Sequence, residues 1–283
     1  MALSSEQVEK FTQDGYLLIE DFYSPTECDH LRDRAFQIIA EADLSQHPVI
    51  TFNTRDNQQA NTDYFITSGD KIRFFFEEGA VDENGKLKVP TERAVNKIGH
   101  ALHALDSEFK KATISESVKG IAGSLGLKKP AVVQSMVIFK QPRFGGAVNS
   151  HQDSTFLYTT PTTLTGFWIA LEDADLENGC LWFVPGSHKN GITRRMRRTT
   201  EEGVLGTTFE GEVPSQKQEE FVAVPVKKGT LVLINGEVVH KSGENVSERS
   251  RNIYTFHLYD AGTSEWSKDN WLQPTESLPF TLL

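Results

Sequence analysis

The stretch AVVQSMVIF, Ala131–Phe139, opens the part of the chain that decides the fold. It is rich in β-branched residues, and similar short apolar runs follow it, separated by turn signals such as Asn178-Gly179 and Pro185-Gly186. The further candidate strands are Thr165–Leu171, Cys180–Val184, Phe221–Val226, Thr230–Ile234 and Asn252–Leu258. Short strands in one block, without intervening helices, predict a sandwich or barrel and not a parallel α/β sheet.

Helical signals dominate the residues before Pro130. Ser4 with Gln7 and Ser24 with Glu27 have the spacing of capping boxes, and a short strand is expected between them at Tyr16–Ile19. Apolar periodicity predicts a helix from Pro25 to about Asp43, an amphipathic helix through Val95, Ile98, Leu102, Leu105 and Phe109, a helix from about Ser115 to Leu125, and a hairpin turn at Asn84-Gly85.

The bulk composition excludes several functions. The net charge is −10, so no global basic field attracts nucleic acid or an anionic membrane. No apolar run approaches the length of a membrane span. The two cysteines, Cys28 and Cys180, are too few for a disulfide framework and fit a reducing compartment. We expect a cytoplasmic protein, monomeric by default, that acts on a small molecule.

A metal site is indicated by His151-Gln152-Asp153 and His240. Residues two apart on a strand point the same way, so His151 and Asp153 can share an ion with a histidine from a neighbouring strand. Two imidazoles and one carboxylate on one face of a metal are typical of iron(II) oxygenases. Arg251 opens the next strand, and its guanidinium can hold a carboxylate of a dicarboxylate such as 2-oxoglutarate. Taken singly, each residue is more often structural; the joint pattern carries the prediction.

A longer series of motifs runs along the chain. It comprises His151-Gln152-Asp153, Trp168, Asn178-Gly179-Cys180-Leu181, Pro185-Gly186-Ser187-His188, His240-Lys241-Ser242-Gly243-Glu244-Asn245 and Arg251. Together these motifs resemble the phytanoyl-CoA dioxygenase family of Fe(II)/2-oxoglutarate-dependent oxygenases. The resemblance covers nearly the whole chain. It implies a mainly β fold with packed helices, built on a double-stranded β-helix of the jelly-roll or cupin-like kind.

The order of helical and strand signals along the chain predicts a single domain, and the resemblance implies a set of site residues. Residues 1–283 would form a single catalytic domain, with a mostly helical part at 1–129, the jelly-roll core at 130–260 and a tail at 261–283. The implied metal ligands are His151, Asp153 and His240. The implied 2-oxoglutarate residues are Arg251 and Ser242, with Lys97, Met136 and Trp168 lining the same pocket.

The residues alone support one of these assignments and give a structural interpretation of others. Ser242 lies two residues past His240, so an extended chain points both side chains the same way. Without the resemblance, Trp168 and Met136 would be core residues and Lys97 a solvated lysine on a helix. His100 and His103 would lie on a partly exposed helix face, and His188 in a structural turn.

Two charged or polar segments remain open to interpretation. The run Arg194–Arg198 is expected to be a solvated loop, with anion binding as the alternative. The polar segment Thr199–Glu220 is expected to be a mobile or lid-like loop.

The implied activity uses Fe(II), 2-oxoglutarate and O2. It would produce succinate and CO2 and hydroxylate an unidentified small apolar or lipid-like substrate; the carboxylate at Asp153 favours hydroxylation over halogenation. Three alternatives stay open: a 2-hydroxylase of acyl-CoA, a non-catalytic sensor of 2-oxoglutarate and metal, and a cupin that holds another divalent metal.

Overall fold

Two sheets that face each other carry the fold of the computed structural model, which describes residues 1–42, 44, 48, 50–52, 62–82, 84, 86–201 and 203–283. The large sheet has the order β1-β13-β8-β15-β5-β4-β3-β2, with β17 beside β5. Its strands are β1 (Tyr16–Ile19), β2 (Thr51–Phe52), β3 (Ile72–Glu77), β4 (Val95–His100), β5 (Pro130–Lys140), β8 (Thr165–Ala170), β13 (Leu231–Asn235), β15 (Arg251–Asp260) and β17 (Thr281–Leu282). All of its pairs are antiparallel except β2 with β3.

The smaller sheet has the order β12-β9-β14-β6 and is antiparallel. Its strands are β6 (Val148–His151), β9 (Leu181–Phe183), β12 (Val222–Val224) and β14 (His240–Ser242). Two further pairs lie outside the sheets: β7 (Thr159–Thr160) with β16 (Glu265–Trp266), and β10 (Arg194–Glu201) with β11 (Val204–Gly211). The strands predicted after Pro130 are confirmed.

The two faces of the large sheet are buried in different ways. On strand β8, Phe167 and Ile169 belong to one apolar cluster and Trp168 and Ala170 to the other, as the two-residue period of a strand requires. The cluster of Trp168 includes residues of the small sheet such as Phe183. The cluster of Phe167 includes helical residues, among them Leu31 and Phe109.

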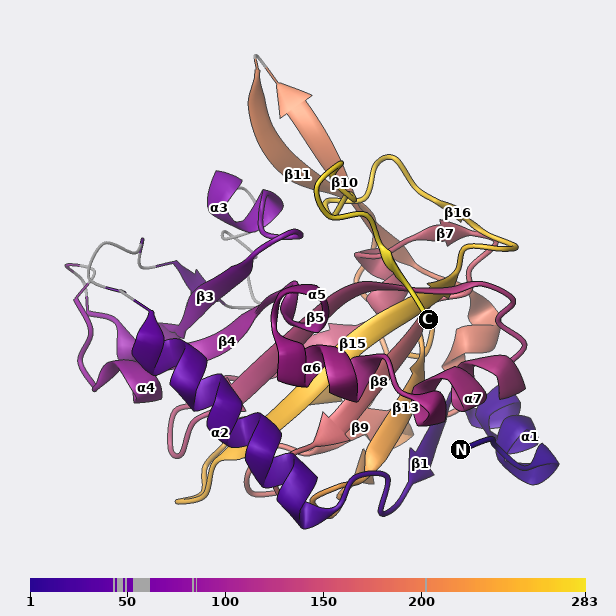
Figure 1. The fold of residues 1–283 in the computed structure, drawn as a ribbon, viewed down its shortest axis with the longest axis horizontal. Coiled ribbons are helices and arrows are strands. Elements are labelled where there is room, and N and C mark those ends of the chain that lie inside the picture. Colours follow the sequence, from indigo (N-terminus) through magenta and orange to yellow (C-terminus); the bar gives the residue numbers. More distant parts are fainter. Residues whose placement is uncertain are drawn as a thin grey trace.

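Helices cover the second face of the large sheet. Helix α2 (Pro25–Glu41) crosses in front of it, with α6 (Ser107–Thr113) and α7 (Glu116–Ser124) beside it (Figure 1). Helix α1 (Ser5–Asp14) and α2 both begin with the predicted capping boxes, at Ser4 and Ser24. One-turn α-helices in the described residues are α3 (Asp63–Ile66), α4 (Thr91–Ala94) and α5 (Leu102–Leu105).

The predicted amphipathic helix through Val95 and Phe109 is wrong in its first half. Residues 95–100 form β4, which pairs with β3 on one side and β5 on the other. Apolar spacing of three to four residues fits a helix, yet both ladders take up the backbone hydrogen bonds here. The one-turn helix α5 follows β4, and the next helix, α6, starts where the Asp106 side chain accepts from the amides of Glu108 and Phe109.

The solvated loop expected at Arg194–Arg198 and the loop expected at Thr199–Glu220 are also corrected. Most of this segment is the hairpin β10–β11, paired in register from Arg194 with Gly211 to Glu201 with Val204. It projects from the body of the molecule (Figure 1). Charged residues have low strand propensity, so the sequence of this segment gives only a weak indication of strands. The turn predicted at Asn84-Gly85 lies partly outside the described residues, since Gly85 is not among them.

None of the helices in the described part of the chain has the length and apolar character that a membrane crossing requires.

Candidate metal centre and its cavity

Three separated residues meet at the edge of the small sheet. His151 ends β6, His240 begins β14, and the two lie opposite each other in the ladder. Asp153 begins the short 3-10 helix η4 (Asp153–Thr155). The Asp153 Oδ1 atom lies 3.6 Å from His151 Nε2 and 3.8 Å from His240 Nε2. One donor atom from each of the three residues lies within 4.8 Å of the other two.

Both histidines are oriented with Nε2 toward this centre. Nδ1 of His151 lies 2.8 Å from the carbonyl oxygen of Asn149, and Nδ1 of His240 lies 3.1 Å from that of Val238. A carbonyl only accepts, so Nδ1 carries the proton and Nε2 presents its lone pair. Metal ligands in proteins lie about 2.0–2.2 Å from the ion, so donors 3.6–3.8 Å apart fit a shared ion.

The electrostatics keep these groups in the protonation states that a cation requires. Burial, helped by the neighbouring His151, lowers the pKa of His240 to about 4. Burial alone would raise the pKa of Asp153, yet His240 and His257 together hold it well below its ordinary value. A neutral imidazole and an ionised carboxylate are the forms that bind metal.

His257 is a partner of this centre that the sequence analysis missed. Its Nε2 lies 3.2 Å from Asp153 Oδ2, and its Nδ1 lies 3.2 Å from the amide nitrogen of Gln134. Because that amide donates to Nδ1, Nε2 carries the proton and donates to Asp153. A Cβ at Gly166 would lie 3.3 Å from Asp153 Oδ2, so glycine gives the carboxylate room against β8. His257 therefore engages one carboxylate oxygen and leaves the other for the centre.

A signal for His257 was present in the sequence. Residues 251, 253, 255 and 257 alternate along β15 and share one face, and Arg251, Thr255 and His257 line the same cavity. Once Arg251 was singled out, the two-residue period would have pointed to His257.

The cavity beside the centre has a volume of about 470 Å³, and all the predicted site residues line it. They are His151, Asp153 and His240 together with Lys97, Met136, Trp168, Ser242 and Arg251. Lys97 reaches it from β4, and not from a helix. His100, expected to be partly exposed, is buried, lines the cavity and has Nδ1 2.8 Å from Ser68 Oγ. His103 is buried too, against Ser135.

Three buried basic side chains line the cavity, Lys97, Lys140 and Arg251. Burial lowers the pKa values of both lysines well below their ordinary value. Arg251 lies opposite Lys140 in the ladder of β15 and β5. Among the described residues, no carboxylate lies within ion-pair distance of Arg251, and its buried Nε has no hydrogen-bond partner. Burial lowers the pKa of Arg251 to about 10, so it remains charged at neutral pH. An anion is the ligand that the cavity around Arg251 fits.

Lys140 was also missed, although it directly follows the apolar stretch at 131–139. Its Nζ donates to Ser242 Oγ at 3.0 Å and to the carbonyl oxygens of Gly146 and Gly243 at 2.7 and 2.6 Å. It therefore fastens the end of β5 to β14 and orients the Ser242 hydroxyl at the cavity wall.

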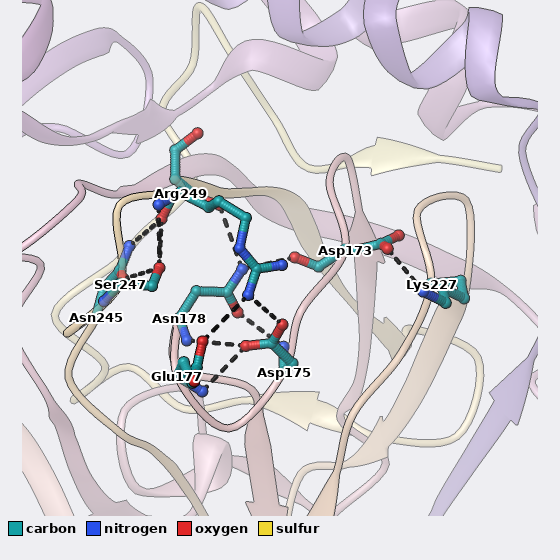
Figure 2. A network of polar contacts seen from close by, with 9 residues as sticks. Asp173, Asp175, Glu177, Asn178, Lys227, Asn245, Ser247 and Arg249 are labelled. Carbon is teal, nitrogen blue, oxygen red and sulfur yellow. Dashed lines mark hydrogen bonds and ion pairs between the residues drawn. The ribbon is translucent and has the colours of Figure 1, made fainter.

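A polar network outside the cavity fixes the turn between Ser242 and Arg251 (Figure 2). The Asn245 amide donates to the carbonyl oxygens of Lys140 and Arg249 at 3.0 and 2.6 Å. Arg249 pairs with Asp175 at 2.7 Å, and the Asn178 amide donates to the carbonyl oxygen of Asp173 at 2.8 Å. These contacts hold in place the segment that joins β14 to β15, and with it the two strands that supply His240 and Arg251.

Comparison with known proteins places the chain in a family. The family model described as phytanoyl-CoA dioxygenase (PhyH) matches residues 11–253. The chain is 55% identical to phytanoyl-CoA dioxygenase domain-containing protein 1 of Bos taurus, covering 98% of this chain and 97% of that protein. It is 45% identical to phytanoyl-CoA dioxygenase of Arabidopsis thaliana, covering 96% of this chain and 94% of that protein.

Solved structures share the fold. The non-heme alpha ketoglutarate dependent carbocyclase SnoK from nogalamycin biosynthesis superposes with a TM-score of 0.63 at 19% identity, covering 99% of this chain and 96% of that one. EctD from S. alaskensis with 2-oxoglutarate and 5-hydroxyectoine has a TM-score of 0.61 at 18% identity, covering 91% and 76%. The expected jelly-roll core is confirmed. The chain belongs to the phytanoyl-CoA dioxygenase family and is a 2-oxoglutarate-dependent dioxygenase.

Proposed function

We propose that His151, Asp153 and His240 hold Fe(II), that the cavity around Arg251 binds 2-oxoglutarate, and that the enzyme hydroxylates a small apolar substrate. The observation that carries the proposal is the pairing of a three-donor cluster with a buried arginine that lacks a carboxylate partner among the described residues, both in one cavity.

The chain's own residues would bind and orient the reactants. Arg251 would take the distal carboxylate of 2-oxoglutarate in two parallel hydrogen bonds, and Ser242, fixed by Lys140, would donate to the same group. Met136 and Trp168 would exclude water from the stem of the co-substrate. His257 would hold Asp153 so that a single oxygen faces the ion.

The bound iron, with 2-oxoglutarate and O2, would supply the oxidising chemistry: one oxygen atom enters succinate as CO2 leaves, and the other enters a C–H bond of the substrate. Residues 1–283 would act as one catalytic domain, because helix α2 and the strands of the large sheet share one apolar cluster. The apolar side chains Phe65, Leu157 and Trp271 line the cavity as well and suit an apolar substrate.

The direct test is an anaerobic titration of the protein with Fe(II) and 2-oxoglutarate. A visible charge-transfer band should appear at one equivalent of each, and succinate should form when O2 is admitted. A folded protein that develops no band would contradict the proposed site. A band without any succinate, even on long incubation, would instead favour a 2-oxoglutarate sensor.

A further inference from the structure

The arginine run at the base of the hairpin is divided between two faces of β10. Arg195 and Arg197 face the C-terminal part of the chain: Arg195 donates to Ser267 Oγ at 3.1 Å, and Arg197 pairs with Asp269 at 3.1 Å. Arg194 and Met196 lie on the other face and line the cavity. A run that appears uniform in the sequence therefore holds anchoring residues and cavity residues in alternation.

The base of the hairpin is fastened to the metal centre by Gln152, which stands between two of the proposed ligands. Its side-chain oxygen accepts from the Thr193 amide at 3.0 Å, and its nitrogen donates to the carbonyl oxygens of Gly191 and Glu237 at 2.8 and 2.6 Å. Gln152 is buried, and β10 packs against the short helix η4 that begins at Asp153. Arg194 follows Thr193 directly, so its backbone is held beside the reaction centre.

The surroundings of Arg194 are apolar. Its guanidinium carbon lies 3.8 Å from the ring centre of Phe209, on the partner strand β11. The Phe209 ring meets Phe156 edge to face at 6.3 Å, and Phe156 meets the His151 ring at 6.0 Å. A series of aromatic contacts thus leads from a proposed iron ligand to Arg194.

Arg194 has no anion of its own in this region. Among the described residues, no carboxylate lies within ion-pair distance of its guanidinium, and its buried Nε lacks a hydrogen-bond partner. Burial lowers its pKa, so its charge is poorly solvated. An anionic ligand in the cavity would stabilise this partly buried guanidinium by an ion pair and hydrogen bonds.

We propose that Arg194 binds a carboxylate of the substrate, and that the substrate is a compact apolar acid whose body lies along Phe156, Met196 and Trp271. This inference rests on the proposed function, because it places the substrate in the cavity of the metal centre. Arg251 and Arg194 then have separate tasks, one for the co-substrate acid and one for the substrate acid.

The free acid is favoured over a thioester by size and charge. The cavity of about 470 Å³ must hold 2-oxoglutarate as well as the substrate. A thioester has no charge at the carbonyl carbon, and the phosphates of a coenzyme A group lie far from the acyl chain. An arginine at the hairpin base, beside the centre, matches a charge that is close to the reacting carbon.

The test measures binding without turnover. The full-length protein, anaerobic and loaded with Fe(II) and 2-oxoglutarate, is titrated with hexanoate, octanoate and decanoate, and with decanol and decanoyl-CoA. Calorimetry gives the affinity, and tryptophan fluorescence provides a second signal because Trp168 and Trp271 line the cavity. The variant is Arg194→Gln, and the matched control is Arg198→Gln, four residues along β10 and outside the cavity.

Wild-type protein should bind at least one alkanoate about tenfold or more tightly than decanol. Arg194→Gln should remove that preference and leave decanol binding unchanged, while Arg198→Gln should behave as wild type. The inference would be overturned if no alkanoate binds, if Arg194→Gln keeps the preference, or if decanoyl-CoA binds more tightly than decanoate.

The result is separable from that of the proposed function. The charge-transfer band of iron with 2-oxoglutarate reports the metal centre and is recorded in each variant before the acids are added. If Arg194→Gln keeps the band and loses only acid binding, both proposals stand. If the band is absent from the wild type, the proposed function fails, whereas alkanoate binding that Arg194→Gln removes would still support Arg194 as the acid-binding residue.

Discussion

Strand β15 and the hairpin β10–β11 both border the cavity, and they are built in opposite ways. All ten residues of β15 are buried, and it pairs with β5 on one side and β8 on the other. In the described part of the chain, the hairpin strands pair only with each other, and no residue of β11 is fully buried. The strand that holds Arg251 and His257 is therefore fixed by the whole sheet, whereas the strand that holds Arg194 depends on a few local contacts.

This contrast separates the chemistry from the choice of substrate. Arg251 and His257, which would hold the co-substrate and orient a metal ligand, lie in a strand that is buried along its whole length, where their geometry costs little to maintain. The hairpin can change its cavity residues without disturbing the sheets. We therefore expect substitutions at the β15 end to impair the reaction itself, and substitutions in the hairpin to affect which substrate binds.

The largest effect is expected from Asp153→Ala. It leaves two imidazoles without the carboxylate, and loss of a ligand should exceed the ~10–100-fold cost of losing an outer partner. Succinate formation from 2-oxoglutarate measures it, with Asp269→Ala near the hairpin as the matched control. Unchanged succinate release would refute the role of Asp153 as a ligand.

Arg251→Gln tests the proposed binding of 2-oxoglutarate by strand β15. Removing the charge that would hold the distal carboxylate should raise the KM for 2-oxoglutarate roughly 30-fold or more, with a smaller change in kcat at saturation. The control is Arg198→Gln, which changes an arginine of β10 that lies outside the cavity. A variant that binds 2-oxoglutarate as well as the wild type would remove Arg251 from the pocket.

His257→Ala should weaken metal binding by about tenfold, because Asp153 loses the donor that orients it. Titration with Fe(II) or Co(II), followed by the visible spectrum, measures the affinity. His257→Gln should restore part of the loss, since an amide can also donate to Asp153. If alanine and glutamine variants bind metal equally, His257 has no positioning role.

The buried region should also make stability depend on pH. Burial lowers the pKa of His103 to about 4, against an ordinary value near 6.5. Between these values the unfolded chain binds a proton that the folded chain does not. The contribution of neutral His103 to the free energy of unfolding is therefore complete above about pH 6.5 and is lost as the pH falls toward 4. Urea unfolding at pH 7 and pH 5 should show a smaller decrease for His103→Gln than for the wild type; equal decreases would contradict the assignment.

The smallest effect is expected in the hairpin. Arg197→Ala removes a partly exposed pair with Asp269 and should lower the free energy of unfolding by less than ~1 kcal/mol. Binding of 2-oxoglutarate should not change. A larger loss of stability in urea would show that the hairpin unfolds together with the sheets and is not held by local contacts alone.

Local signals in the sequence predicted much of the frame. Elements that depend on residues close together in the chain can be predicted from the sequence. They include the capping boxes at Ser4 and Ser24, the strand Tyr16–Ile19 and the strands after Pro130. The same holds for the spacing of His151 and Asp153. Their roles as ligands stay a prediction, while the structure brings them together with His240.

By itself, the sequence determined which residue types could build a metal centre and where an acid-binding arginine could follow. Only the tertiary structure decided that residues 95–100 form a strand, that Lys140 and His257 reach the cavity, and that Arg194 faces inward while Arg195 faces outward. The physical reason is that these outcomes depend on ladders and contacts between residues far apart in the chain. A helix cap is stabilised within one turn, but the side of a strand that faces a cavity is fixed by its partner strands.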